Sequence, residues 1–175
     1  MRLIRLTAVV MLALSLALGA QPAAGGSAWV TFTHPNPPFA IQYPGDWVRL
    51  AADKVALLVL VDPETRGLGL VVVGVEVGPG ENAYNLEPRL PQIISRSFSD
   101  YRPLRTDRTA LNGRPAIVHY FTGIRNGVRV YVMLGAVATN AWGYVLYGTT
   151  TVDSPRLREE LGLLQRIIAG FRPGR

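Results

Sequence analysis

Cysteine is absent from this sequence of 175 residues, and histidine occurs only twice, as His34 and His119. Without cysteine the chain can form no disulfide, no thiolate zinc site, no cysteine nucleophile and no lipid anchor on an N-terminal cysteine. A zinc site needs three or four nitrogen, sulfur or oxygen ligands, which two isolated histidines do not supply. His119 is therefore expected to be structural. A metal role for it would require a carboxylate partner, for which Asp107 is the candidate.

Recognisable catalytic and cofactor-binding patterns are also missing. There is no G-x-S-x-G motif, and Ser95, Ser97 and Ser99 have no histidine nearby in the sequence. The segment Gly67-Leu68-Gly69 lacks the third glycine of a dinucleotide-binding loop. The pair Glu159–Glu160 is adjacent, so its side chains would point about 100° apart on a helix and form no working dyad. We expect no catalytic residue, no cofactor and no metal ion, and a protein that is not an enzyme.

Lysine is nearly absent as well. Lys54 is the single lysine among 18 basic residues, which stand against 12 acidic ones and give a formal net charge of +6. Hydrophobic residues make up 49% of the chain and charged residues 17%. This composition is too apolar for a disordered chain and is sufficient for a sizeable core.

The first residues have the composition of a secretory signal. Arg2 and Arg5 precede an uncharged apolar run over residues 6–20, followed by a segment rich in alanine and glycine. The run of about 15 residues is shorter than the ~20 that a membrane-spanning helix needs, which favours cleavage over an uncleaved membrane tether. We expect a signal peptide and short linker at residues 1–26, a single domain at residues 27–175, and export to the periplasm or the cell exterior.

Arginines gather in one segment, where two aspartates interrupt them. Five basic residues this close together could bind an anionic membrane surface or an acidic partner protein. Nucleic acid is disfavoured as a partner by the signal peptide. The alternative is that arginine replaces lysine on an ordinary solvated surface. The candidate patch consists of Arg96, Arg102, Arg105, Arg108 and Arg114.

Hydrophobic periodicity predicts strands followed by a helix, then strands and a second helix. Strands are expected at residues 29–33, 39–43, 47–50, 55–61, 67–77, 104–110, 115–124, 128–138 and 142–150. The pairs Asn112-Gly113 and Asn126-Gly127 predict tight hairpin turns. Leu90, Ile93, Ile94 and Phe98 predict a helix at residues 87–99. A second helix is expected between a capping Ser154 and Gly170, with one apolar face.

The stretch Phe39–Trp47 combines an alternating strand with a turn. Pro44 and Gly45 suit the two central positions of a type II turn, because proline fixes a negative φ and glycine accepts a positive one. We expect residues 47–50 to return antiparallel to residues 39–43 and so complete a first hairpin.

Hairpins in series favour an antiparallel sheet, and the order of elements predicts an α+β domain. Several strands are apolar on both faces, as in residues 128–134, where Val130 and Val132 alternate with Tyr131 and Met133. Both faces of the sheet centre must then be covered, most simply by the two helices on opposite sides.

These features resemble the PsbP-like family, which is named for an extrinsic photosystem II subunit and shares its fold with Ran-binding import factors of the Mog type. Phe39–Trp47 is similar to the family's opening F-x-I-x-Y-P-x-x-W, and Leu111–Ala116 to its central hNGxPA turn. Gly143–Leu146 and the helix end Ile167–Arg172 complete the pattern. The resemblance implies an α/β/α sandwich around an antiparallel sheet of about six strands. It implies no chemistry, because family members mostly act as binding or assembly subunits.

The sequence therefore predicts an exported, non-enzymatic binding or assembly domain of the cell envelope. Its ligand would be a partner protein or a small apolar or anionic molecule. Two alternatives remain: an envelope hydrolase with an unrecognised site, and an accessory structural subunit of a membrane complex.

Overall fold

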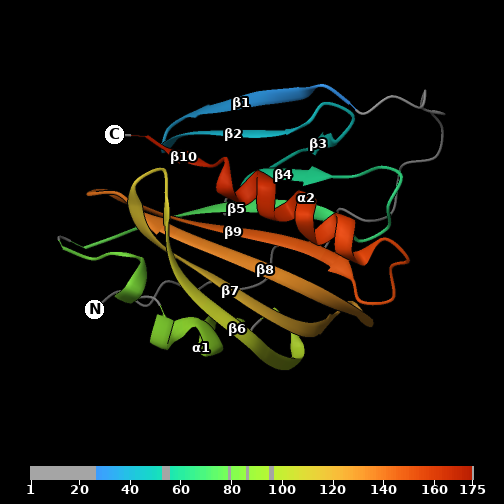
Figure 1. Ribbon diagram of the computed structural model, residues 1–175. Helices are drawn as coiled ribbons and strands as arrows, with labels where there is room; N and C mark the ends of the chain where they lie inside the picture. The colour runs from blue at the N-terminus through green and yellow to red at the C-terminus, as the bar shows by residue number, and fades with distance from the viewer. Residues whose placement is uncertain (1–26, 53–55, 79, 86, 95–96, 175) are drawn as a thin grey trace.

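The computed structural model describes residues 27–52, 56–78, 80–85, 87–94 and 97–174. The expected signal peptide and Arg96 lie outside this part of the chain. Its centre is a seven-stranded antiparallel sheet (Figure 1). In spatial order the strands are β3 (Val48–Leu50), β4 (Ala56–Val61), β5 (Gly69–Glu76), β9 (Trp142–Thr151), β8 (Val128–Ala138), β7 (Arg114–Arg125) and β6 (Ser99–Leu111).

A second, three-stranded sheet lies beside the helix α2 (Leu157–Ala169) on one face of the large sheet (Figure 1). It consists of β1 (Trp29–Pro35), β2 (Pro38–Pro44) and β10 (Arg172–Pro173). The described residues thus form ten strands in two sheets, which corrects the expected single sheet of about six. The antiparallel class was predicted correctly. The small sheet was missed because residues 172–173 pair with residues far away in the sequence.

The opposite face is covered by two 3₁₀ turns, Ala83–Asn85 and Glu87–Arg89, and by the short helix α1 (Leu90–Ile94). Of the expected helix at residues 87–99, Leu90–Ile94 is α-helical and Glu87–Arg89 forms a 3₁₀ turn. Ser97 and Phe98 both donate their backbone N–H to the carbonyl of Ile94, and β6 begins at Ser99. Both faces of the sheet centre are covered, as predicted, but one face is shared between α2 and the small sheet.

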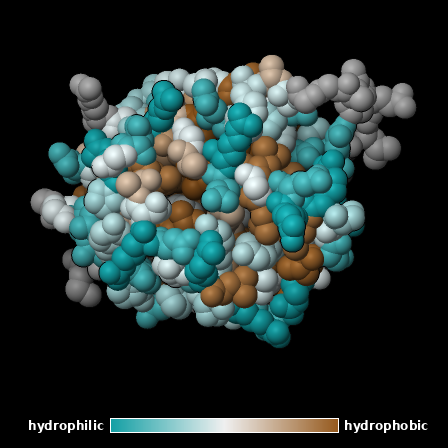
Figure 2. Space-filling model, viewed as in Figure 1, coloured by the Kyte–Doolittle hydropathy of each residue, from teal (hydrophilic) through white to brown (hydrophobic). Residues whose placement is uncertain are grey.

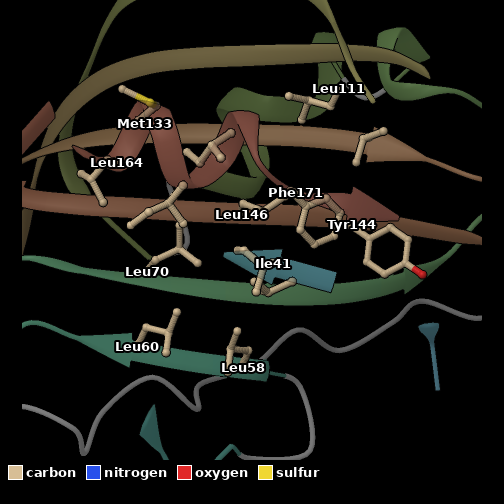
Figure 3. Packing of buried hydrophobic residues seen from close by; sticks show 14 of the residues in the cluster. Ile41, Leu58, Leu60, Leu70, Leu111, Met133, Tyr144, Leu146, Leu164 and Phe171 are labelled. Carbon is tan, nitrogen blue, oxygen red and sulfur yellow. The ribbon is translucent and has the colours of Figure 1, made fainter. Parts of the chain in front are cut away.

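The two faces of the large sheet carry separate hydrophobic clusters. Met133 belongs to the cluster under α2 and the small sheet, and its neighbour Leu134 belongs to the cluster under α1. This is the period-two alternation of a strand that is buried on both sides. Figure 3 shows the larger cluster, in which Ile41 of β2 lies among leucines of β4 and β5 and beside Phe171. The small sheet therefore contributes to the main core.

Two glycines let α2 approach the sheet closely. A Cβ atom on Gly135 would lie 2.8 Å from Cγ2 of Ile168, and one on Gly148 would lie 3.0 Å from Cδ2 of Leu164. Ile168 and Leu164 are both fully buried. Helix α2 begins differently from the prediction, because Arg156 is the N-cap residue and makes no side-chain capping bond. Within the described residues no helix combines the length and apolarity needed to cross a membrane.

The hairpins with Asn-Gly turns are confirmed. Asn112 and Gly113 join β6 to β7, and Asn126 and Gly127 join β7 to β8, all four with positive φ. Strands β4 and β5 also pair as an antiparallel hairpin. Gly170, in contrast, ends α2 with φ −79°, so the left-handed conformation expected of a terminal glycine is not used.

The expected first hairpin after Phe39 is wrong. Trp47 donates its N–H to the carbonyl of Pro44 at 3.1 Å, so Gly45 and Asp46 occupy the central turn positions, and Gly45 has no positive φ. Strand β2 pairs with β1 and β10, whereas β3 pairs with β4. The turn thus carries the chain from the small sheet to the large one. Gly45 is needed for space, because its Cβ would lie 2.8 Å from the carbonyl oxygen of Ala28.

Candidate binding surface

The predicted arginine patch is distributed along strand β6 and the start of β7. Arg105 pairs with Tyr120 in the register, whereas Arg108 pairs with Ile117. Tyr120 and Ile117 belong to the clusters on opposite faces of the sheet, so Arg105 and Arg108 also face opposite ways. Arg114 lies beyond the turn at the end of the strand. The structure therefore keeps Arg102 and Arg105 on one face and separates them from Arg108.

Acidic side chains accompany these arginines. Three ion pairs involve the predicted patch: Arg102 with Asp100 at 3.1 Å, Arg105 with Asp107 at 3.0 Å, and Arg108 with Glu87 at 2.9 Å. Asp100 also accepts from Arg129. Hydrogen bonds from Arg129 and Arg102 lower the pKa of Asp100 below its usual value. The predicted arginine patch is consequently less positive than its arginines alone suggest. Its role in binding stays a prediction.

Arg105 also packs on an aromatic ring. Its guanidinium carbon lies 4.4 Å from the ring centroid of Tyr120. A hydrogen bond with Tyr120 raises the pKa of Arg105 above its usual value. Cation–π contact and ion pairing together hold this side chain against its own sheet.

Strand β6 is an edge strand with several features that discourage further pairing. It carries charged side chains, it contains Pro103, and its register with β7 is interrupted twice, between Ser99 and Arg102 and between Pro103 and Arg105. Charges, proline and bulges are the devices by which proteins protect sheet edges. The other edge of this sheet, β3, has only three residues.

His119 lies in a closed hydrogen-bond network. Its Nε2 is 2.8 Å from Oη of Tyr101, and its Nδ1 is 2.6 Å from Oγ1 of Thr106. The ring is buried, and this burial lowers the pKa of His119. Asp107 pairs with Val118 in the register and so faces the opposite side of the sheet, which removes it as a partner for His119. The network ties edge strand β6 to β7.

The glutamate pair Glu159–Glu160 forms no catalytic dyad either. Glu160 is buried, and its carboxylate accepts hydrogen bonds from Thr150 and, at 2.6 Å, from Ser154. Glu159 is exposed, so the two glutamates do not act as a pair. In the described part of the chain no group of three His, Cys, Asp or Glu residues could hold a metal ion.

Sequence reasoning missed the outer edge of the small sheet. In the described residues β1 pairs only with β2, so its other side has no strand beside it (Figure 1). Strand β1 contains no charged residue, and its Val30 is 39% exposed. The pattern of residues 29–33 predicted a strand correctly, but a single strand's sequence does not tell which of its sides is paired.

Arginines without carboxylate partners lie around this edge. Arg49 of β3 places its guanidinium carbon 5.2 Å from the ring centroid of Phe32, and Arg166 of α2 lies 4.1 Å from the ring centroid of Trp29. Across the described residues, neither arginine has an ion pair. Because Arg49 and Arg166 are far apart in the sequence, the sequence did not indicate that both lie beside β1. Figure 2 shows that the face carrying α2 is otherwise mixed, with separate apolar groups among hydrophilic residues.

No protein-family model matches the chain, and no curated protein matches it. Several solved structures do. The cyanobacterial PsbP (CyanoP) of Synechocystis sp. PCC 6803 aligns with a TM-score of 0.69 at 12% identity, over 90% of this chain and 99% of that one. The architecture is a PsbP-like fold.

Two other solved structures share this fold. LpqN of Mycobacterium tuberculosis, described as involved in cell envelope biogenesis, aligns with a TM-score of 0.60 at 14% identity, over 83% of this chain and 90% of that one. The Ran-binding protein Mog1p of Saccharomyces cerevisiae aligns with a TM-score of 0.57 at 8% identity, over 84% of this chain and 96% of that one. At such low identities the likeness concerns the fold, which the sequence motifs had indicated.

Proposed function

We propose that this protein is an exported binding or assembly domain of the cell envelope that recognises a partner protein and catalyses no reaction. The observation that carries this proposal is the edge of the small sheet. Among the described residues, strand β1 has an unpaired side and no charges of its own, and the two arginines beside it make no ion pair. An uncharged open edge promotes unwanted association in a protein that acts alone. In a protein that acts by binding, the same edge can pair with a strand of the partner.

The fold neighbours support the same class of role. LpqN is described as involved in cell envelope biogenesis, and Mog1p as a Ran-binding protein. The first description fits the export that Arg2, Arg5 and the apolar run of residues 6–20 predict. A Ran partner does not fit that export, so we place the partner in the envelope.

The hydrolase alternative receives less support from the polar groups. Both ring nitrogens of His119 are occupied by hydroxyl groups, and both carboxylate oxygens of Glu160 accept hydrogen bonds from its neighbours. A general base needs a free nitrogen or oxygen that can reach a substrate proton. These two buried groups are instead used to hold strands and a helix together.

Affinity capture tests the proposal. The full-length tagged chain, expressed in its own host and cross-linked before solubilisation of the envelope, should enrich one dominant protein relative to an unrelated exported domain of similar charge. The enrichment should saturate with bait concentration, as specific binding does. Capture of a complete membrane complex would favour the accessory-subunit alternative. If no protein were enriched over the control bait, the binding function would be wrong.

A further inference from the structure

The main-chain groups on one side of β1 point away from the rest of the sheet. Gly45 donates its N–H to the carbonyl of Ala28 at 2.9 Å, so residues 28 and 45 form a hydrogen-bonded pair. Hydrogen bonding alternates along an antiparallel ladder, so Val30 and Phe32 also bond toward β2. The N–H and C=O groups of the intervening residues, including Thr31, must then face outward.

The carbonyl of Pro38 gives the same result independently. It accepts hydrogen bonds at 2.7 Å from the N–H of Gly174 and from Oη of Tyr144, so it faces β10 and not β1. Pro38 pairs with Pro35 in the register, which makes this pair a non-hydrogen-bonded one and fixes the same alternation. Trp29, Thr31 and Thr33 therefore present three N–H and three C=O groups to the outside.

This edge differs from both edges of the large sheet. Strand β6 has charges, a proline and two register shifts, and β3 is only three residues long. Strand β1 has seven residues, and its sequence WVTFTHP is rich in β-branched and aromatic residues up to His34. Such a sequence favours pairing. Compared with these two edges, β1 is the one suited to receive another strand.

The charges beside β1 indicate which strand it receives. Arg49 lies over Phe32 and Arg166 lies over Trp29, and both arginines are exposed residues. Residues 29 and 32 are an odd number of positions apart, so their side chains lie on opposite faces of β1. An added strand would thus meet one arginine on each of its faces.

We propose that β1 binds an extended acidic segment of a partner protein by strand addition, with two carboxylates three positions apart opposite Trp29 and Phe32. The main-chain groups of Trp29, Thr31 and Thr33 hydrogen-bond the segment, and Arg49 and Arg166 select its acidic side chains. This inference rests on the proposed function and names the chemistry of the partner.

A second copy of this chain fits the edge less well. Antiparallel self-pairing centred on Thr31 would place Val30 opposite Phe32 of the other copy, with both copies of Arg49 on the same face of the joined strands. Like charges held close together without a carboxylate oppose this arrangement. When the added strand is an acidic segment instead, a carboxylate faces Arg49, so this repulsion between arginines does not arise.

A labelled peptide tests the proposal directly. The probe is the fluorescent octapeptide VTEVTEVT, whose two glutamates are three positions apart, titrated with the full-length protein at low salt. We expect saturable binding that weakens by at least about tenfold when the glutamates are replaced by glutamines, and by a similar factor when alternate peptide nitrogens are methylated. Methylation changes only the peptide, so its effect is independent of protein stability.

Protein variants locate the site. Thr31→Pro removes an outward N–H and the side-chain acceptor of Gln42 Nε2, which Thr31→Val removes as well, but no main-chain bond to β2. Proline is tolerated on the open side of an edge strand. We expect it to weaken peptide binding at least about tenfold, whereas Thr31→Val leaves binding unchanged. The double variant Arg49→Gln/Arg166→Gln should lose the preference for glutamate, whereas Arg158→Gln, an exposed arginine of α2, should retain it.

Other outcomes of these experiments contradict the proposal. Binding that survives Thr31→Pro in a folded variant, or equal affinity for the glutamine peptide, overturns it. A dimer that Thr31→Pro dissociates would make a second copy the occupant. If envelope capture succeeds equally with wild type and Thr31→Pro, the binding function stands and the β1 site is wrong. If capture fails with both, the function itself is wrong.

Discussion

The guanidinium carbon of Arg166 lies 4.1 Å from the ring centroid of Trp29, which joins the last turns of α2 to the first residue of β1. Both side chains are at least partly exposed, so water screens the attraction. A cation–π contact at such a site contributes about 0.5–1 kcal/mol.

A double-mutant cycle with Trp29→Leu and Arg166→Met should give a coupling free energy of about 0.5–1 kcal/mol from urea unfolding. Leucine and methionine keep apolar contact and remove the ring and the charge. A coupling indistinguishable from zero would mean that the two side chains are neighbours without a net attraction.

Glycine substitutions at positions 45 and 162 should change stability in opposite directions. Gly45→Val forces a side chain against the carbonyl of Ala28 and should lower the free energy of unfolding by about 1–3 kcal/mol. Gly162 is inside α2, and nothing lies within 4 Å of the Cβ it would gain, so Gly162→Ala should raise it by about 0.5–1 kcal/mol. Chemical denaturation measures both, and a neutral Gly45→Val would show that the contact with Ala28 relaxes freely.

The buried carboxylate of Glu160 should contribute measurably to the free energy of unfolding. Glu160→Ala leaves the hydroxyls of Thr150 and Ser154 without their buried acceptor, so we expect a loss of about 1–3 kcal/mol in the free energy of unfolding. Glu159→Ala, the matched exposed neighbour, should change it by less than about 0.5 kcal/mol. Equal effects in the two variants would contradict the account of this network.

Stability should fall as the pH decreases from about 7 to 5, in part through His119. Burial lowers the pKa of His119 in the folded protein below its usual value, so the unfolded chain binds a proton more readily. The stabilisation from neutral His119 is therefore present above the unfolded pKa and is lost as the pH falls through the folded pKa. Melting temperatures of wild type and His119→Gln across this range should converge at the acidic end; parallel curves would rule out His119 as the source.

The arginines of β6 remain a separate predicted surface for anionic membranes. Replacing Arg96, Arg102, Arg105, Arg108 and Arg114 by serine should reduce binding to vesicles containing an anionic phospholipid, with a weak and salt-sensitive effect because carboxylates already pair with three of them. Cosedimentation at two salt concentrations measures it. Unchanged cosedimentation would identify the arginines as ordinary solvated surface.

Local rules made much of this fold predictable. Asn112-Gly113 and Asn126-Gly127 specify their turns through the backbone conformations that those residues adopt, whatever surrounds them. The apolar face of α2 follows from its own spacing, with Leu164 and Ile168 four positions apart. Such features depend on a few neighbouring residues, so sequence is enough.

Features that depend on distant contacts were not predictable. Whether β2 pairs with β3 or with β10 is decided by packing and by bonds such as the one between Tyr144 and Pro38, which are 106 residues apart in the sequence. The grouping of arginines in the candidate site could not be predicted for a related reason. Arg105 and Arg108 are near in the sequence but on opposite faces, whereas Arg49 and Arg166 are far apart in the sequence and meet around one strand.

Helix α2 and Phe171 cover the core that strands β4, β5, β8 and β9 have formed before them in the chain. This sheet face is only partly covered until residues 157–171 join it, because the small sheet, with Phe39 and Ile41, spans only part of it. We therefore expect the complete native core to form only when residues 157–171 are present. A chain without its last helix should leave part of that core in contact with water.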